Sequence, residues 1–308
     1  MSFDMIVDWL QATLRWSAPL IIVSTGEVLS ERSGIINMGI EGIMLSGALC
    51  GVAISFLTGS VLASVLVTIV LGIIMGAAVA FLTVSRRTNQ VVTGLMLNLL
   101  ALGGTNLLFG LLSESRQTRV TTFPVLFPEA WHNIPVVGPV LFQQPVSTLI
   151  ALILPICLSI VLYKTNWGLN VRAIGDNPQS AATAGISVKK IKYQTVILSG
   201  IFAALGGCAL TLGEVGYFAS GGMTAGRGFI VLAAIVVGGW DPIRTALACL
   251  VFGAADAAQL RLQTMESIIP YQFFQMLPYV ITIIALTIMV KRSIVPKTWG
   301  APYDPRDV

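Results

Sequence analysis

The chain has 308 residues, of which 55% are hydrophobic and 10% are charged, and its formal net charge is +4. Because a soluble globular domain has about 25% charged residues, this composition excludes a soluble fold and indicates a protein that crosses a membrane several times. The basic residues lie in loops beside apolar segments, where they set the orientation of a membrane protein, so they do not indicate nucleic-acid binding.

The apolar segments predict an all-α fold, a polytopic transmembrane helical bundle in a single domain over residues 1–308. We expect about nine membrane segments, some of them broken or re-entrant, since a helix needs about 20 apolar residues to cross the hydrocarbon. No linker divides the chain, and the N-terminus lacks the basic region and cleavage site of a signal peptide. The expected segments are residues 5–29, 35–57, 60–84, 91–112, 147–163, 193–213, 228–240, 245–262 and 271–290.

Two of these segments are expected to be irregular. The first, 5–29, contains Arg15, Pro19 and Gly26, which interrupt its apolar run. Residues 228–240 are apolar but short for a full crossing, and they follow a glycine-rich stretch. We therefore expect a broken or re-entrant helix there.

Polar residues in the second segment are candidates for a substrate pathway. Glu41 lies near the middle of an apolar helix, where a carboxylate costs about 2.5–3.5 kcal/mol, so it faces protein, water or a substrate. Asn37 lies one turn before Glu41 and is expected to share its face. The alternative is a structural carboxylate that is tied to backbone amides or to a neighbouring helix.

Other polar and aromatic residues are candidates for the same pathway or for helix packing. Asn98 and Asn106 are eight residues apart, so they share one helix face. Phe218 and Phe229, together with Tyr217, are placed where they could stack on a ring. For each set, contacts between helices are the alternative interpretation.

A polar stripe of Asp256, Gln259 and Gln263 lies near the end of a later segment, and we expect Arg261 to pair with Asp256. The single histidine, His132, is expected on the surface of an outer loop, and one histidine cannot build a histidine-bearing metal cluster. The four cysteines lie in apolar runs and are expected to be small buried hydrophobic residues.

Charge and parity give a consistent topology. Arg86 and Arg87 mark the loop after residue 84 as cytoplasmic. Counting crossings from there places the loop 113–146 outside and the loop 164–192 inside. The lysines of the loop 164–192 favour the same side independently.

The cytoplasmic loop 164–192 carries strong local signals for a short helix. Pro178 suits a first helical position, Asn177 precedes it as a cap, and Gly185 is a C-terminal stop. A capped helix in a basic loop offers a surface to a cytoplasmic partner. The alternative is an ordinary solvated loop.

We also expect an internal repeat. Two stretches each have a glycine before an apolar helix and another at its far end, so that Gly34 aligns with Gly226 and Gly47 with Gly239. The halves of transporters commonly repeat in this way, with the substrate site between them.

Two long motifs resemble one family of transport proteins. They are LSERSGIINMGIEGIMLSGA at 29–48 and VRAIGDNPQSAATAGI at 171–186, and both are similar to signatures of ABC importer permeases of the branched-chain amino acid, ribose and nucleoside group. Residues 222–242 (GMTAGRGFIVLAAIVVGGWDP) and 252–263 (FGAADAAQLRLQ) resemble its simple-sugar and nucleoside branch. The resemblance covers nearly the whole chain.

This resemblance implies a transmembrane permease subunit of a binding-protein-dependent importer, which moves a nucleoside or simple sugar inward. The chain has no GxxxxGK[ST] phosphate loop, so we expect no enzyme activity and no cofactor in it; ATP and Mg would bind a separate cytoplasmic ATPase subunit. The other implied partners are an extracytoplasmic substrate-binding protein, the lipid of the bacterial cytoplasmic (inner) membrane, and a second permease, either a paralogous chain or an identical copy.

In this family the loop that here spans 164–192 contains the coupling segment, which docks in a groove of the ATPase. Asp176 stands where relatives often have Glu, and that change is small. The implied pathway passes Asn37, Glu41 and Asn98, and the outer loop and the turn 262–270 would receive the binding protein. The residues that match the coupling motif are Arg172, Ala173, Gly175, Asp176, Asn177, Pro178, Ala181, Ala182 and Gly185.

Two alternative functions remain as hypotheses at this point. An ion-coupled secondary transporter would use Glu41, Glu214 and Asp256 as proton or sodium sites, and it would need no capped cytoplasmic helix. An intramembrane enzyme is disfavoured by the single histidine and by the lack of paired carboxylates on one helix. Between the two substrate classes, the branch resemblance favours a nucleoside over a sugar.

Overall fold

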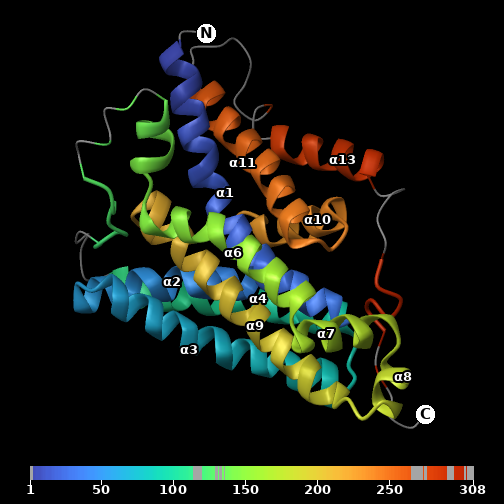
Figure 1. Ribbon diagram of the computed structural model, residues 1–308. Coiled ribbons are helices and arrows are strands. Elements are labelled where there is room, and N and C mark those ends of the chain that lie inside the picture. Colours follow the sequence, from blue (N-terminus) through green and yellow to red (C-terminus); the bar gives the residue numbers. More distant parts are fainter. Residues whose placement is uncertain are drawn as a thin grey trace.

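The computed structural model describes residues 3–113, 120–128, 131, 134, 136–264, 273, 276–289, 295–301 and 303, and it confirms an all-helical chain (Figure 1). These residues form no strand, only an isolated bridge between Val125 and Pro145. The helices are α1 (Phe3–Arg32), α2 (Ile40–Thr58), α3 (Val61–Ala80), η1 (Phe81–Ser85), α4 (Gln90–Ser113), η2 (Gly138–Phe142), α6 (Val146–Lys164), α7 (Asn166–Asp176), α8 (Pro178–Thr183), α9 (Val188–Ala209), η3 (Leu210–Val215), α10 (Arg227–Gly238), α11 (Pro242–Thr264) and α13 (Leu277–Met289).

Among the described residues, six helices are long and apolar enough to cross a membrane: α2, α3 with η1, α4, α6, α9 with η3, and α11. The expected number of nine segments is not confirmed. α1 is 30 residues long but is not apolar enough, and the described parts of α10 and α13 have 12 and 13 residues. The short α10 agrees with the broken helix expected at 228–240.

Two predicted element boundaries are wrong. α1 continues without interruption through Arg15, Pro19 and Gly26. In a packed apolar bundle, neighbouring helices support a helix that contains proline, and at Gly26 the missing side chain admits Phe202 of α9. The second segment begins as a helix at Ile40 rather than at residue 35, because residues 33–39 form a turn.

α1 and α9 form the central helix pair, and small residues allow their close approach. A Cβ atom added to Gly26 would lie 2.6 Å from the Cβ atom of Phe202, and one added to Gly206 would lie 2.1 Å from a methyl group of Val23. α2 meets α9 in the same way, because a Cβ atom on Gly47 would lie 2.1 Å from the carbonyl oxygen of Ala204. Backbones that approach this closely are typical of packing between membrane helices.

The expected internal repeat stays a prediction, and the helix contacts are compatible with it. α1 packs against α11, while α9 packs against α3, so each member of the central pair contacts a helix of the other half. The proposed glycine alignment is wrong, however. Gly34 lies in the turn after α1 whereas Gly226 directly precedes α10, and Gly47 lies inside α2 whereas Gly239 ends α10.

The two expected loop regions lie at opposite ends of α6, as the parity argument requires. At the α7–α8 end, Ser85 contacts Tyr193 at 2.6 Å, so the connection between η1 and α4 lies beside the start of α9. At the opposite end, Arg15 donates to the carbonyl oxygen of Gln143 at 3.0 Å. His132 and residues 114–119, 129–130, 133 and 135 of the outer loop lie outside the described residues.

We expect the crossing of α2 and α9 to be intolerant of a single added methyl group. Gly47→Ala should lower the apparent unfolding temperature of the purified protein in detergent, because overpacking costs about 1–3 kcal/mol. The matched control is Gly103→Ala on α4, where a Cβ atom meets nothing within 4 Å. Alanine favours a helix over glycine, so this control should unfold at the same or a higher temperature. Equal destabilisation by both variants would contradict the packing argument.

Candidate functional site

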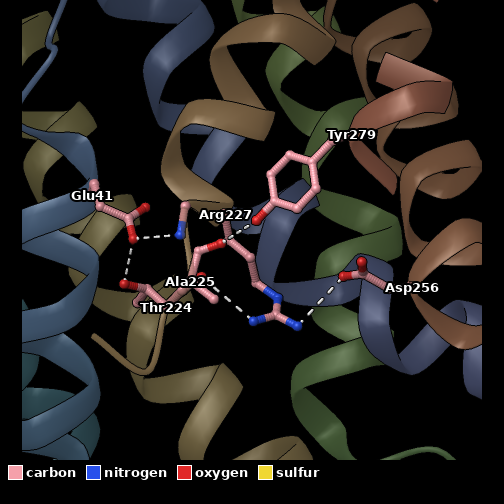
Figure 2. Close-up of polar contacts among 7 residues, drawn as sticks. Glu41, Thr224, Ala225, Arg227, Asp256 and Tyr279 are labelled. Atoms are coloured by element: carbon pink, nitrogen blue, oxygen red, sulfur yellow. Dashed lines mark hydrogen bonds and ion pairs between the residues drawn. The ribbon is translucent and has the colours of Figure 1, made fainter. Parts of the chain in front are cut away.

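α10 begins among other helices, and a carboxylate of α2 binds its first turn. One oxygen of Glu41 accepts hydrogen bonds from the Thr224 hydroxyl at 2.5 Å and from the Gly226 N–H at 2.9 Å (Figure 2). The other oxygen accepts from the Gly228 N–H at 2.7 Å. The first N–H groups of a helix have no partner within the helix, and the helix dipole favours an anion there. We call this arrangement the Glu41 clamp.

The Glu41 clamp accounts for the two glycines that it contains. Gly226 has a φ of +77°, which a residue with a side chain rarely adopts. A Cβ atom on Gly228 would lie 2.8 Å from the Cα atom of Glu41, so only glycine lets the two backbones meet. Glu41 is half-buried, and the contacts favour the structural interpretation of this residue.

Arg227 and the preceding residue connect the same turn to three further helices, and Figure 2 shows the contacts to Asp256 and Tyr279. The guanidinium of Arg227 lies 3.5 Å from the carboxylate of Asp256 on α11 and 5.1 Å from the ring centre of Trp16 on α1. The Tyr279 hydroxyl of α13 donates to the carbonyl oxygen of Ala225 at 3.1 Å. The start of α10 is therefore held from α1, α2, α11 and α13.

The predicted pair between Arg261 and Asp256 is wrong. Arg261 donates to the carbonyl oxygen of Met5 at 2.8 Å and lies 3.5 Å from Asp8, while Asp256 pairs with Arg227. Residues five apart on a helix are separated by about 1.4 turns, so the two side chains point to different faces of α11.

Asn37 lies in a closed polar network between α1, α2 and α9, and it is fully buried. Its N–H donates to Glu27 at 2.9 Å, and its side-chain amide donates to the Ser199 hydroxyl at 3.0 Å. Ser199 in turn donates to Glu27 at 2.5 Å. The shared face expected for Asn37 and Glu41 is wrong, because Asn37 lies in the turn before α2.

Asn98 and Asn106 both project from α4 to backbone groups next to the Glu41 clamp. Asn98 accepts from the Gly42 N–H at 2.8 Å and donates to the carbonyl oxygen of Met38 at 2.9 Å, so it caps the start of α2. Asn106 accepts from the Gly221 N–H at 2.9 Å. The predicted common face of the two asparagines is confirmed, and both side chains bind backbone N–H or carbonyl groups.

The aromatic residues of this region do not form one stack. Phe218 is buried and packs at a tilt against Phe109, with 5.1 Å between ring centres. Phe229 is 42% exposed and Tyr217 is 59% exposed. Only Phe218 belongs to the packed interior, and Phe229 lies on the open face of α10.

The second candidate region is the α7–α8 hairpin, whose local predictions are confirmed. The side chain of Asn177 accepts from the Ser180 N–H at 3.0 Å, and Pro178 is the first residue of α8. Gly185 follows α8 with a φ of +83°. The helix α7 was not predicted; the Thr165 side chain caps it by accepting from the Gly168 N–H at 3.1 Å.

Burial divides the coupling-motif residues into a packed side and an exposed edge. Gly175 faces the end of α1, where a Cβ atom would lie 2.0 Å from the carbonyl oxygen of Arg32. Arg172 lies over the ring of Tyr163 at 5.2 Å. The buried residues are Gly175, Pro178 and Ala181, the half-buried ones are Arg172, Ala173 and Ala182, and the exposed ones are Asp176, Asn177 and Gly185. The exposed edge also includes Gln179, Ser180 and Thr183, which the sequence analysis did not select.

Comparison with known families decides the assignment. Residues 10–286 match the family described as the permease component of the branched-chain amino acid transport system. The chain belongs to this permease family. Within the part of the permease that the structure describes, no group of three or more His, Cys, Asp or Glu residues could hold a metal ion.

The permease is similar over most of its length to several named ABC transporter permeases. It is 35% identical to the guanosine ABC transporter permease NupQ of Bacillus subtilis (strain 168), over 95% of each chain. It is 37% identical to the nucleoside ABC transporter permease NupC of Lactococcus lactis subsp. cremoris (strain MG1363), over 94% of each chain. It is also 37% identical to TsgC13 of Haloferax volcanii, which carries the name of a glucose ABC transporter permease, over 83% of this chain and 78% of that one.

The Glu41 clamp should be a cooperative unit of the permease. Glu41→Ala leaves three donors unpaired and should lower stability strongly, since each hydrogen bond to a charged group contributes about 1.5–3 kcal/mol. Thr224→Ala should lower the stability less than Glu41→Ala does. The double variant should be destabilised by less than the sum of the two single effects, because the two residues share a contact. Thermal unfolding in detergent measures all three.

The control for the clamp is Thr58→Ala at the other end of α2, where the hydroxyl donates to the carbonyl oxygen of Ile54 at 2.7 Å and accepts from the Ser60 N–H at 3.2 Å. This variant should add its effect independently to that of Glu41→Ala. Strict additivity between Glu41→Ala and Thr224→Ala would count against the clamp.

Proposed function

We propose that the permease is the membrane subunit of an ABC importer that moves nucleosides into the cell, powered by a separate ATPase subunit that binds ATP and Mg. The observation that carries this proposal is the α7–α8 hairpin: a stiff, capped helix with an exposed polar edge, in a chain of the permease family. Such a helix is suited to seat in a groove on a cytoplasmic partner.

The names of the relatives support nucleosides as the substrate class. Two relatives that match over at least 94% of this chain are named for guanosine or nucleosides. TsgC13, which is named for glucose, matches over 83% of this chain. A simple sugar is therefore the second candidate.

The distribution of charge supports a cytoplasmic position for the hairpin. Exposed cations gather at the α7–α8 end of the bundle, as the positive-inside rule requires. They are Arg86, Lys164, Lys189, Lys190, Arg244 and Lys297. The site of action would be the bacterial inner membrane, and the opposite end, with residues 120–128 and 136–145, would receive the substrate-binding protein.

We place the substrate pathway beside the Glu41 clamp. Glu41, Asn98 and Asn106 keep part of their surface uncovered, and Phe229 is exposed close by on α10. Asn37 does not belong to the pathway in this proposal, because its network is buried and complete. The proposal also keeps about nine membrane segments, with α10 as a half-crossing.

The exposed face of α4 supports a second permease chain as a partner. Only 11% of the residues in its most apolar stretch are buried within this chain. Leu99, Leu100 and Leu107 project from it, each about two thirds exposed or more. A paralogous chain is the partner that the resemblance favours, and a second copy is the alternative.

An ion-coupled secondary transporter is not favoured. Of its three proposed sites, Glu41 has both oxygens bound to α10 and its preceding turn, and Asp256 is paired with Arg227. A carboxylate that holds a helix end in this way is not available for ion exchange without releasing the helix. Glu214 has one buried oxygen without a hydrogen-bond partner, so the match to the permease family is what weighs against this alternative.

The exposed edge of the hairpin provides the test. Asp176→Ala and Gln179→Ala should each lower the stimulation of ATP hydrolysis by loaded binding protein about tenfold in the reconstituted transporter, the effect of losing one important interface contact. Arg172→Ala is less suitable, because Arg172 packs on Tyr163 within the permease.

The matched control for the hairpin edge is Lys190→Ala, an equally exposed change in the first turn of α9 and outside the motif. This variant should keep full stimulation. Normal stimulation in both edge variants would remove the assignment of the hairpin as the ATPase contact.

A further inference from the structure

A strap formed by residues 295–301 and 303 lies at the α7–α8 end, beside α7 in Figure 1. The N–H of Thr298 donates to the carbonyl oxygen of Gly175 at 3.1 Å, and the hydroxyl donates to the same oxygen at 2.7 Å. The last carbonyl groups of a helix lack partners within the helix. Thr298 therefore caps the end of α7.

The next residue of the strap joins a buried carboxylate of α1. Trp299 donates from its indole N–H to an oxygen of Glu31 at 2.9 Å, and Trp240 donates to the same oxygen at 2.5 Å. Glu31 is 1% exposed, so water does not compete for this contact. The two indole rings meet edge to face, with centres 5.7 Å apart. One oxygen thus connects the strap with the turn between α10 and α11.

Trp240 fixes the far end of α10. Its N–H donates to the carbonyl oxygen of Ile235 at 3.1 Å, and its own carbonyl oxygen accepts from Arg32 at 2.8 Å. The first turn of α10 is held in the Glu41 clamp. With 12 residues, α10 is a rod about 18 Å long, fixed at both ends.

We infer that the strap transmits movement of the α7–α8 hairpin to α10, and through α10 to the Glu41 clamp. This inference rests on the proposed function, in which the ATPase moves the hairpin. In the described part of the chain, α7 packs mainly against α1, α6, α8 and α9. One link from α7 to the α10–α11 turn runs through Thr298, Trp299 and Glu31. Hydrogen bonds to a buried carboxylate are directional and costly to break, so a shift of α7 would carry Trp240 with it.

A second set of contacts reaches the same turn on the exposed side. Arg172 of α7 lies over the ring of Tyr163, whose hydroxyl donates to Asp241 at 3.0 Å. These side chains are in contact with water, which weakens and screens their interactions. The strap contact ends on the buried carboxylate of Glu31, so it is the stronger connection, and Tyr163→Phe separates the two experimentally.

Transport by the complete reconstituted transporter tests the strap. Thr298→Val and Trp299→Phe each remove one donor and should lower the amount of guanosine imported per ATP hydrolysed about threefold to tenfold, the range for losing one contact in a coupling network. If the wild-type transporter imports glucose instead, glucose replaces guanosine as the probe. Because neither residue lies on the exposed edge of the hairpin, binding of the ATPase subunit should not change.

Three further variants sharpen this test. Thr298→Ser keeps the hydroxyl and should restore import per ATP. Trp9→Phe removes an indole hydrogen bond to the carbonyl oxygen of Ala254 at the opposite end and should have no effect on the ratio. The double variant Thr298→Val with Trp299→Phe should import as much substrate per ATP as the more impaired single variant, because the two contacts lie in series.

The inference is overturned if both single variants import at the wild-type ratio, or if Tyr163→Phe alone lowers the ratio. A loss of the ratio that accompanies loss of ATPase binding would also overturn it, because the effect would then be one of docking. If the wild-type complex shows no substrate-stimulated ATP hydrolysis, the proposed function fails first. If the wild-type complex is coupled and the strap variants import the same amount per ATP, the inference about the strap is rejected while the proposed function stands.

Discussion

The carboxylate of Glu41 is the contact on which the functional region depends. Water cannot satisfy the N–H groups of a helix that begins inside an apolar bundle, and an unpaired group there is expensive. Glu41 supplies two acceptor oxygens to Thr224, Gly226 and Gly228, so α10 can begin between α2, α11 and α13. This requirement explains both the charged residue in an apolar helix and the glycine at position 228, where the backbones touch.

The sequence predicted those features that are decided within a few residues. The cap by Asn177, the start of α8 at Pro178 and the end near Gly185 depend only on local backbone geometry, and all three are correct. Hydrophobic stretches located the six spanning helices, because length and apolarity alone define them. The common face of Asn98 and Asn106 followed from helix periodicity, although what the two side chains bind did not.

Features that depend on distant partners could not be predicted. α2 starts at Ile40 because Glu27 and Ser199 hold the preceding turn, and both belong to other helices. Arg261 was assigned to Asp256 on the same helix, but helix geometry turns it toward the start of α1. The strap gave no local signal, because Trp299 and its carboxylate are 268 residues apart. The packing of whole helices determines which polar residues meet in an apolar interior. A single sequence does not contain this information in a local pattern.

The two carboxylates that hold α10 come from consecutive helices, and this fixes how α10 can move. Glu31 ends α1 and Glu41 begins α2, with the Gly34 turn between them. The strap contacts that turn too, because the Gly300 N–H donates to the carbonyl oxygen of Gly34 at 3.2 Å. A displacement of this turn therefore reaches both ends of α10 together. A short helix that is held in this way responds by shifting as a rod, and its first turn is bound to Glu41, next to the Gly42 N–H that donates to Asn98.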